Sequence, residues 1–420
     1  MLTTFAKRTI LATAISGMLS TAAFAGSVEV LHYWTSGGEA KSAAVLKDLL
    51  EKEGHEWKDF AVAGGGGESA MTVLKSRAVS GNPPSAAQIK GPDIQEWADL
   101  GFLTELDNVA GKNNWDQLLP PVVANVMKHD GHYVAVPVNV HRVNWLWANP
   151  EVLKKSGIEE VPTSWEELIL VAPKIKAAGY IPLAHGGQAW QDATLFEAVV
   201  LGVGGADFYQ KTMVEADADA LSGDTMIKVL DTFKRLRPLM DDDAAGRDWN
   251  IATAMVINGK AAMQVMGDWA KGEFTAAGKI PGKDFICAPA PGTDKAFTFN
   301  VDSFAMFDVK NDADKQAQAD LARLILEPTF QETFNLNKGS IPVRTDLSMD
   351  NFDSCAKMSM IDFIKTSKQG GLVPSMAHGM AVPSAVQGAI YDTVTNFFNS
   401  DDMTPEQAAE KLAKAVRAAI

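Results

Sequence analysis

The sequence predicts an α/β protein built from two lobes, each a sheet flanked by helices. The chain has 420 residues, and the roughly 395 that remain after a predicted leader exceed what one hydrophobic core usually serves. Apolar runs typical of strands alternate with helical patterns along residues 28–100, which favours parallel strands covered by helices. The apolar (46%) and charged (21%) contents are those of an ordinary globular protein.

Residues 1–25 have the pattern of a cleavable secretory signal. Lys7 and Arg8 precede an apolar, alanine-rich stretch that ends on Ala23-Phe24-Ala25. Thr and Ser interrupt this stretch, and it is too short to span a bilayer. No cysteine follows the cleavage site to carry a lipid. We therefore expect an exported, soluble protein that begins near Gly26.

The expected mature chain is acidic. Its formal charge moves from −14 to −16 when Lys7 and Arg8 leave with the signal. Nucleic acid and anionic membranes attract clustered Lys and Arg, so this balance argues against both partners. The acidic run at residues 241–243 lacks the alternating oxygen ligands and turn glycine of a calcium loop, and we expect a solvated loop and no metal site.

Two cysteines remain in the exported chain, Cys287 and Cys355. An oxidising compartment favours a disulfide between them. The alternative is that both cysteines are unpaired buried thiols. A thiol count on the denatured, unreduced protein distinguishes the disulfide from the free thiols.

The first half of the chain is expected to repeat strand, loop and helix. The expected strands are residues 28–34, 60–63 and 86–89, with helices following the glycines at 37–38, at residues 71–79 and at 94–100. A hairpin turn at Asp130-Gly131 leads into an extended segment at 133–143. A crossing between lobes is expected here.

The second half is expected to be mainly helical as far as Met240. Three segments have the residues that favour the start of a helix, namely an N-cap residue with a proline or acidic residues in the first turn. They are Asn149-Pro150, residues 162–167 (PTSWEE), and Thr404-Pro405 ahead of the last helix. Residues 296–309 are apolar and β-prone, which predicts a strand pair that returns to the first lobe.

Sequence motifs for catalysis and cofactors are largely absent. The chain has no G-x-S-x-G, H-E-x-x-H or G-x-x-x-x-G-K-[ST] pattern. Gly65, Gly67 and Ala70 match the permissive G-x-G-x-x-A spacing of dinucleotide-binding loops. The next predicted strand, however, leads into Lys90 where the acid that binds the ribose is expected. We therefore interpret residues 64–67 as a flexible loop and expect no cofactor. A glycosidase remains the enzymatic alternative, because its two carboxylates need not be neighbours in sequence.

Aromatic residues at breaks in regular structure suggest a sugar site. Sugars present flat apolar faces and a rim of hydroxyls, so aromatic platforms and hydrogen-bonding side chains recognise them. The chain has 10 Trp. Trp34 follows Tyr33 at a strand end, Trp249 is expected in a loop, and Trp269 follows Gly267-Asp268. Core packing is the alternative for each of them.

Four stretches resemble the carbohydrate-specific solute-binding proteins of ABC importers (extracellular solute-binding protein family 1), most closely their periplasmic glucose/mannose-type branch. They are residues 30–40 (VLHYWTSGGEA), 149–168, 257–274 and 337–344 (NKGSIPVR). The resemblance implies a non-enzymatic, monomeric, two-lobed clamp of the periplasmic binding protein fold that closes on a sugar, expected to be glucose, and delivers it to a membrane permease. The implied N-terminal lobe comprises residues 26–138 and 298–350, and the C-terminal lobe residues 139–297 and 351–420.

The resemblance also implies a set of sugar-binding residues. Aromatic walls and platforms are expected from Tyr33, Trp34, Trp249 and Trp269, and polar contacts from Glu39, Lys90, Asp302, Lys338 and His378. Structural roles are the alternatives: Glu39 as a helix-start charge, Lys338 as a helix-end cap, and His378 as a surface-loop residue. His141 and His185 are expected to be core or loop residues.

Overall fold

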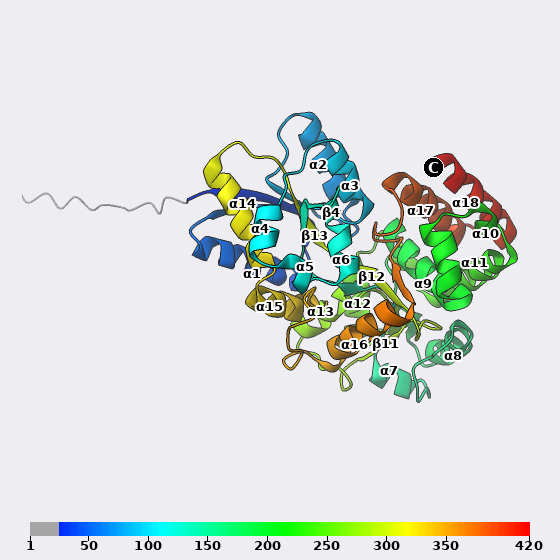
Figure 1. Ribbon diagram of the computed structural model, residues 1–420. Coiled ribbons are helices and arrows are strands. Elements are labelled where there is room, and N and C mark those ends of the chain that lie inside the picture. Colours follow the sequence, from blue (N-terminus) through cyan, green and yellow to red (C-terminus); the bar gives the residue numbers. More distant parts are fainter. Residues whose placement is uncertain (1–24) are drawn as a thin grey trace, which may run out of the picture.

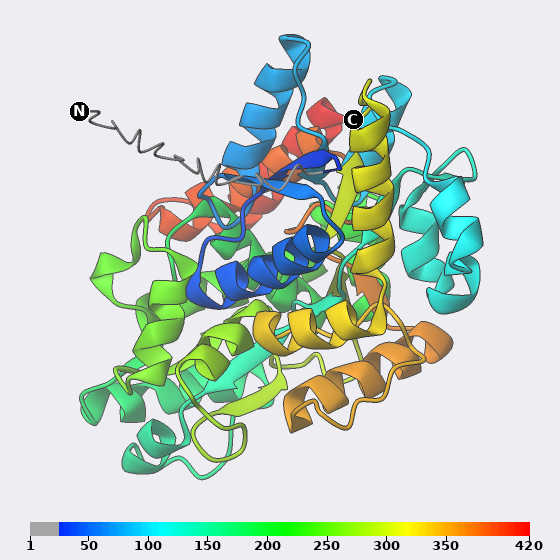
Figure 2. The same cartoon turned by 90° about the vertical axis from the view of Figure 1, so that its left-hand side faces the viewer.

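A computed structural model describes residues 25–420 of the chain. The predicted signal lies outside the described residues, apart from its last position, Ala25. Two groups of sheets and helices lie side by side, and the chain passes between them several times (Figures 1 and 2). Within residues 25–420, no helix is both long enough and apolar enough to span a membrane.

The first sheet has the order β2-β1-β3-β13-β6. Its strands are β1 (Ser27–His32), β2 (Glu56–Ala61), β3 (Ala86–Gln88), β6 (Ala135–Pro137) and β13 (Ser303–Met306). β1 is parallel to β2 and β3 as predicted, but β13 is antiparallel to β3 and β6. The parallel strands predicted within residues 28–100 are therefore confirmed, and β13, from the strand pair predicted to return to this lobe, adds an antiparallel neighbour.

Helices surround the first sheet. They are α1 (Gly37–Lys52), α2 (Glu68–Val79), α3 (Pro92–Asp99), α14 (Asp312–Ile325) and α15 (Pro328–Lys338). On α1, Leu46 and Leu50 are fully buried, one turn apart on the face toward the core. α4 (Asp107–Lys112), α5 (Trp115–Leu118) and α6 (Pro121–Val126) precede a small hairpin, β4 (Lys128–His129) and β5 (His132–Tyr133). The hairpin turns at Asp130 and Gly131, both with positive φ, as predicted.

The second sheet has the order β11-β8-β10-β9. It consists of β8 (Trp145–Ala148), β9 (Ile181–Leu183), β10 (Ala261–Val265) and β11 (Ile286–Pro289). The helices around it are α7 (Pro150–Lys155), α8 (Trp165–Ala177), α9 (Ala189–Tyr209), α10 (Ala218–Leu221), α11 (Asp224–Leu236), α12 (Trp249–Ile257), α13 (Trp269–Ala276), α17 (Ser384–Asn399) and α18 (Pro405–Ala419).

The predicted helix starts are confirmed. Asn149, Ser164 and Thr404 each accept a backbone N–H of the first turn of α7, α8 and α18. The prediction that Trp249 lies in a loop is wrong: Asp248 is extended at the N-cap and Trp249 is the first residue of α12. Trp269 likewise opens α13. Both rings are therefore placed at the N-terminal ends of helices.

A third, three-stranded sheet connects the two halves. Its order is β14-β12-β7, with β7 (His141–Arg142), β12 (Phe297–Asn300) and β14 (Leu372–Pro374). The predicted strand pair at 296–309 is β12 and β13, which lie in different sheets with residues 301–302 between them.

Two hydrophobic clusters lie on either side of this third sheet. Along the chain, the first contains residues up to Val140 and again from Phe297 to Met380, and the second begins at Val143. α16 (Ser354–Gln369) contributes Ala356 and Phe363 to the first cluster and Cys355 to the second. We propose the lobe boundaries given above, with the chain crossings at the third sheet acting as the hinge.

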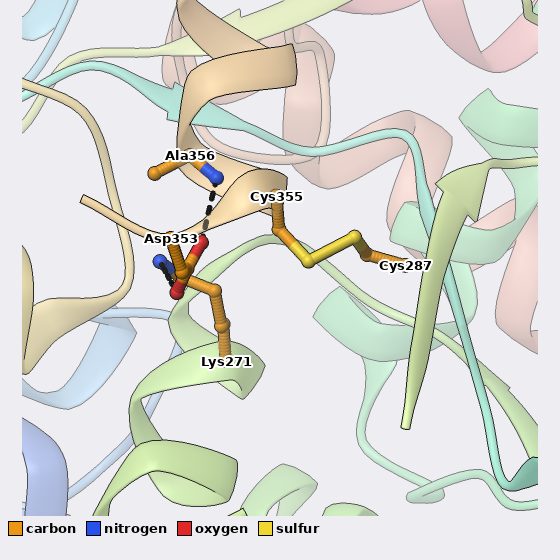
Figure 3. Close-up of a disulfide and its surroundings, with 5 residues drawn as sticks. All are labelled: Lys271, Cys287, Asp353, Cys355 and Ala356. Carbon is orange, nitrogen blue, oxygen red and sulfur yellow. Dashed lines mark hydrogen bonds and ion pairs between the residues drawn. A yellow bond between two sulfur atoms is a disulfide. The ribbon is translucent and has the colours of Figure 1, made fainter. Parts of the chain in front are cut away.

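Cys287 on β11 and Cys355 on α16 form a disulfide with Cα atoms 6.1 Å apart (Figure 3). The expected pairing is confirmed, and neither thiol is free. Beside it, Asp353 caps α16 by accepting from Ala356 N (2.8 Å) and pairs with Lys271 Nζ (2.8 Å). The bridge and this ion pair hold α16 against the second lobe.

Candidate functional site

A cavity of about 300 Å³ lies at the ends of the strands, between the two lobes. All nine residues expected to bind sugar line it. Its lining comprises Tyr33, Trp34, Glu39, Gly65, Lys90, His141, Trp249, Trp269, Asn300, Asp302, Lys338 and His378. Three of these, Gly65, His141 and Asn300, were not anticipated. Residues that are up to 345 positions apart in sequence therefore line one partly open cavity.

The first sheet explains how its residues reach the cavity. Tyr33 and Trp34 directly follow β1, and Lys90 lies two residues after β3. The carboxyl ends of parallel neighbours meet at one edge of a sheet, which is where α/β folds place ligands. Asp302 reaches the same edge from the segment between β12 and β13.

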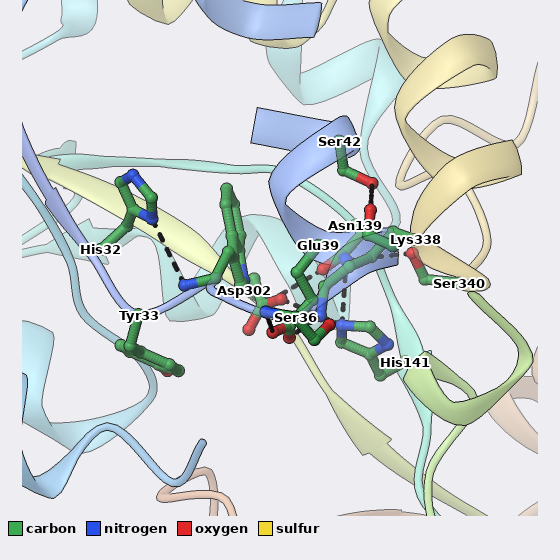
Figure 4. Close-up of polar contacts among 12 residues, drawn as sticks. His32, Tyr33, Ser36, Glu39, Ser42, Asn139, His141, Asp302, Lys338 and Ser340 are labelled. Atoms are coloured by element: carbon green, nitrogen blue, oxygen red, sulfur yellow. Dashed lines mark hydrogen bonds and ion pairs between the residues drawn. The ribbon is translucent and has the colours of Figure 1, made fainter. Parts of the chain in front are cut away.

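Glu39 and Lys338 form a buried ion pair in the wall of the cavity, with 2.6 Å between Oε1 and Nζ (Figure 4). Glu39 is also the third residue of α1, and its Oε2 accepts from Ser36 N in a capping box. Lys338 ends α15 before Gly339, which has a φ of 92°. Glu39 therefore has the helix-start role given as its alternative, whereas Lys338 does not cap α15, since Gly339 is the C-cap and the Lys338 Nζ is bonded to Glu39. Both residues line the cavity.

His141 lies between two buried carboxylates. Its Nδ1 contacts Asp268 Oδ1, and its Nε2 lies 2.9 Å from Asp302 Oδ2. Burial alone would lower the pKa of His141, but the charges and hydrogen bonds of Asp268 and Asp302 outweigh it and raise that pKa. Burial likewise opposes ionisation of Asp302, yet His141, Lys90 and Lys338 hold its pKa well below the usual range. His141 is thus an imidazolium bridging two aspartates.

Aromatic rings pack around the same point. Trp269 meets His141 edge to face at 5.2 Å and His378 at 4.8 Å between ring centroids. Trp34 is backed by Phe304 at 5.4 Å and Phe334 at 5.2 Å. Trp34 is therefore backed by two core rings, whereas Trp269 packs against two histidines that line the cavity with it.

The glycine loop at 64–67 contacts the aromatic residues of the other lobe. A Cβ at Gly65 would lie 2.8 Å from Trp249, and one at Gly66 would lie 2.9 Å from Trp190. Only glycine permits backbone and indole rings to approach this closely. The loop thus brings the first lobe directly onto the tryptophans of the second.

The segment that carries His378 is fixed by a buried glutamate on α9. Glu197 accepts hydrogen bonds from Ser375 Oγ (2.6 Å), Tyr209 Oη (2.8 Å) and Ala377 N (3.0 Å). Burial raises the pKa of Glu197 to about 7 although these bonds oppose the rise. His378 is itself buried, which lowers its pKa well below the ordinary value and keeps the ring neutral. His378 is not the surface-loop residue of the alternative interpretation.

Two other histidines are outside the cavity. His185 is a core residue as expected, buried and 2.8 Å from Asp192. His132 lies close to Glu105 and Asp107 in an exposed group with metal-like spacing. Its Nδ1 is already bonded to Asp107 Oδ2 at 2.6 Å, so this group is a surface ion pair.

Residues 33–322 match the family described as bacterial extracellular solute-binding protein. The chain belongs to this family. The solute-binding protein is 51% identical over 393 residues to a "probable sugar-binding periplasmic protein" of Brucella melitensis, covering 94% of this chain and 92% of that protein. A protein of the same description from Rhizobium meliloti is 50% identical over 410 residues, covering 97% and 98% of the two chains.

Solved structures share the fold. A bacterial solute receptor, AcbH, described as having an exclusive substrate preference for b-D-galactopyranose, has a TM-score of 0.79 and covers 94% of this chain and 99% of its own. Its sequence identity is 19%. The two-lobed α/β architecture is therefore that of the solute-binding family.

Proposed function

We propose that this solute-binding protein captures a neutral monosaccharide, glucose foremost, in the periplasm and delivers it as a monomer to the permease of an ABC importer. The observation that carries the proposal is the single cavity that gathers aromatic platforms and hydrogen-bonding side chains from both lobes. The names of the Brucella and Rhizobium relatives agree with sugar binding in the periplasm.

The charges in and behind the cavity favour a neutral ligand. Three carboxylates, those of Glu39, Asp268 and Asp302, face three cations, those of His141, Lys90 and Lys338. A uronic acid or an amino sugar would add an uncompensated buried charge, which is costly. A hexose adds none and can both donate to the carboxylates and accept from the lysines.

Binding and closure are coupled because the site draws on both lobes. Trp34, Glu39 and Lys338 belong to the first lobe, whereas Trp249 and Trp269 open helices of the second. A sugar touches all of them together only when the lobes meet. The ligand therefore shifts the clamp toward the closed form, which is the form offered to the permease.

The carboxylates favour capture over hydrolysis. A retaining glycosidase needs an acid and a nucleophile about 5 Å apart on either side of the scissile bond. Here Glu39 is paired with Lys338, and Asp268 and Asp302 are both engaged by His141. The relatives are named as binding proteins. Incubation with oligosaccharides should therefore release no reducing sugar.

The test uses Asp302→Asn, with Asp308→Asn as the matched control on an exposed residue of the same segment. Both proteins are unfolded and refolded to remove copurified ligand and then titrated with glucose in a calorimeter. We expect the control to bind as wild type and Asp302→Asn to bind at least tenfold more weakly. Equal affinity in the two variants would remove Asp302 from the site.

A further inference from the structure

His141 connects the two lobes in the wall of the sugar cavity. It lies on β7 of the third sheet and is only 1% exposed. Asp268, which its Nδ1 contacts, follows β10 of the second sheet and directly precedes Trp269 and α13. Asp302 Oδ2, 2.9 Å from its Nε2, comes from the segment between β12 and β13 of the first sheet (Figure 4). One imidazole ring therefore joins a residue of each lobe.

The two carboxyl residues are also anchored to the backbone around this ring. Asp268 Oδ2 accepts from Arg142 N at 2.9 Å, and the N–H of Asp268 donates to Arg142 O at 3.0 Å. On the other side, Asp302 N donates to Asn139 Oδ1 at 3.2 Å. Both aspartates are therefore fixed to the segment 139–142 that carries the ring.

The ring of His141 has no hydrogen bond left to offer a sugar. Each of its two nitrogens faces a carboxylate, and an imidazolium has only two N–H groups. Trp269 packs against the ring edge to face, with the centroids 5.2 Å apart. Although His141 lines the cavity, its effect on a ligand must pass through the groups that it holds.

Asp302 keeps one oxygen for a ligand. Its Oδ2 is engaged by His141, whereas its Oδ1 has no hydrogen-bond or ion-pair partner within residues 25–420. The side chain lines the cavity. A hydroxyl that donates to a carboxylate forms a strong, charge-assisted hydrogen bond, provided that neighbouring groups hold the carboxylate in the productive geometry. The bond from His141 fixes this geometry.

The proton on Nε2 of His141 decides whether Asp302 is held. Nε2 lies 3.0 Å from Asn139 Nδ2 as well as 2.9 Å from Asp302 Oδ2. With its proton, Nε2 donates to Asp302; without it, Nε2 would accept from Asn139 and repel the carboxylate. Burial opposes the charged ring, but the charges and hydrogen bonds of Asp268 and Asp302 outweigh burial and raise the pKa of His141. The ring therefore keeps the form that holds Asp302.

We propose that His141 is a positioning residue of the sugar site: anchored by Asp268, it holds Asp302 Oδ2 so that Oδ1 of the same carboxylate accepts from one sugar hydroxyl. This inference rests on the proposed function and deepens it, because it names the group that selects this hydroxyl. A sugar that lacks the hydroxyl loses the bond and is rejected. His141 thus sets selectivity without a hydrogen bond of its own to the ligand.

His141→Gln tests the inference, with His185→Gln as the matched control. His185 is also a buried histidine paired with an aspartate, Asp192 at 2.8 Å, but it lies outside the cavity lining. Asp268→Asn is the second variant, because it keeps the ring and removes the charge that anchors it. Asp302→Asn identifies the hydroxyl that the carboxylate contacts. Melting curves confirm that each variant is folded.

Calorimetry measures the affinity of each protein for glucose and for analogues that each lack one hydroxyl. In wild type, loss of the hydroxyl that Asp302 contacts should weaken binding at least tenfold. In His141→Gln, loss of the same hydroxyl should matter less than threefold, while the other hydroxyls contribute within twofold of wild type. Asp268→Asn should change the contribution of this hydroxyl in the same direction. His185→Gln should bind every analogue as wild type does.

The contrary outcomes separate the two proposals. A merely structural role would weaken all the sugars alike, so a uniform loss in His141→Gln overturns the inference. An unchanged contribution of the hydroxyl in both variants, or no hydroxyl whose contribution depends on Asp302, overturns it as well, and each of these results leaves sugar capture intact. Failure of wild type to bind glucose or any analogue overturns the proposed function itself.

Discussion

Gly65→Ala should block closure of the clamp without unfolding either lobe. The new Cβ would lie 2.8 Å from Trp249 Cδ1 and 3.1 Å from Trp190 Cζ2. Carbon atoms in contact prefer separations of about 3.5–4.0 Å, so the loop and the second-lobe rings must move apart by about 1 Å. The strain falls on the arrangement described here, in which the loop at 64–67 meets Trp249 and Trp190 of the second lobe.

The size of the effect follows from overpacking. Forcing extra carbon into a packed contact costs about 1–3 kcal/mol, and each 1.4 kcal/mol is tenfold in affinity. We therefore expect sugar to bind about 5- to 140-fold more weakly. Gly65 does not have a positive φ, so alanine fits its backbone, and the ligand-free protein should melt at the wild-type temperature or slightly above it.

Isothermal titration and a thermal melt measure the two quantities, with Gly111→Ala as the control. A Cβ at Gly111 has no atom within 4 Å. The reasoning is refuted if Gly65→Ala binds sugar within twofold of Gly111→Ala. A loss of ligand-free stability would also contradict it, since the strain would then lie within a lobe.

Three further predictions concern stability. Lys338→Met leaves Glu39 buried without its cation and should lower the free energy of unfolding, measured in urea, by about 3–5 kcal/mol. Adding Glu39→Gln to the same chain should restore much of this loss. No restoration would mean that the two side chains are not coupled. Because the pKa of His141 is raised on folding, its contribution is complete below the unfolded value of about 6.5 and is lost as pH rises through the folded pKa. The unfolding free energy should therefore fall with pH above about 6.5 in wild type and less steeply in His141→Gln, and equal slopes would speak against an imidazolium. Replacing Cys287 and Cys355 by serine should cost up to about 4 kcal/mol, because the bridge spans 68 positions; an unchanged denaturation midpoint would contradict this.

The strand-end residues could be predicted from the sequence because strand ends converge. Tyr33, Trp34 and Lys90 follow apolar runs that form β1 and β3, and the edge where such strands finish is a general ligand position. Trp249 and Trp269 were suggested by their positions at expected breaks in regular structure. The polar contacts, Lys90 included, came from a family resemblance, since no local pattern connects Asp302 with Lys338 or His378. The structure places all of them around one cavity.

His141 could not be predicted because its partners are remote. Asp268 and Asp302 lie 127 and 161 positions away, and a lone histidine in an extended apolar run looks like a core residue. The structural importance of the glycines at 65 and 66 was hidden in the same way, since tight packing against Trp249 and Trp190 depends on how the two lobes meet. Contacts between lobes leave no periodic trace in either segment.

Local chemistry also misled at two elements. Trp249 follows an acidic, polar stretch that resembles a loop, yet Asp248 makes that stretch the cap of a helix. The segment 296–309 reads as one strand pair, whereas β12 and β13 join different sheets. The partner strand is decided by the strands that lie beside it in space. These are remote in sequence, so the segment alone does not reveal them.

Calorimetric titration of refolded, ligand-free protein with D-glucose tests the central claim most directly. Glucuronate and glucosamine serve as charged analogues. The charge-matched cavity predicts one-site binding of glucose with a dissociation constant near 1 μM, about −8 kcal/mol, and binding of either charged analogue at least tenfold weaker. No heat with any hexose, or tighter binding of a charged analogue, would contradict the account.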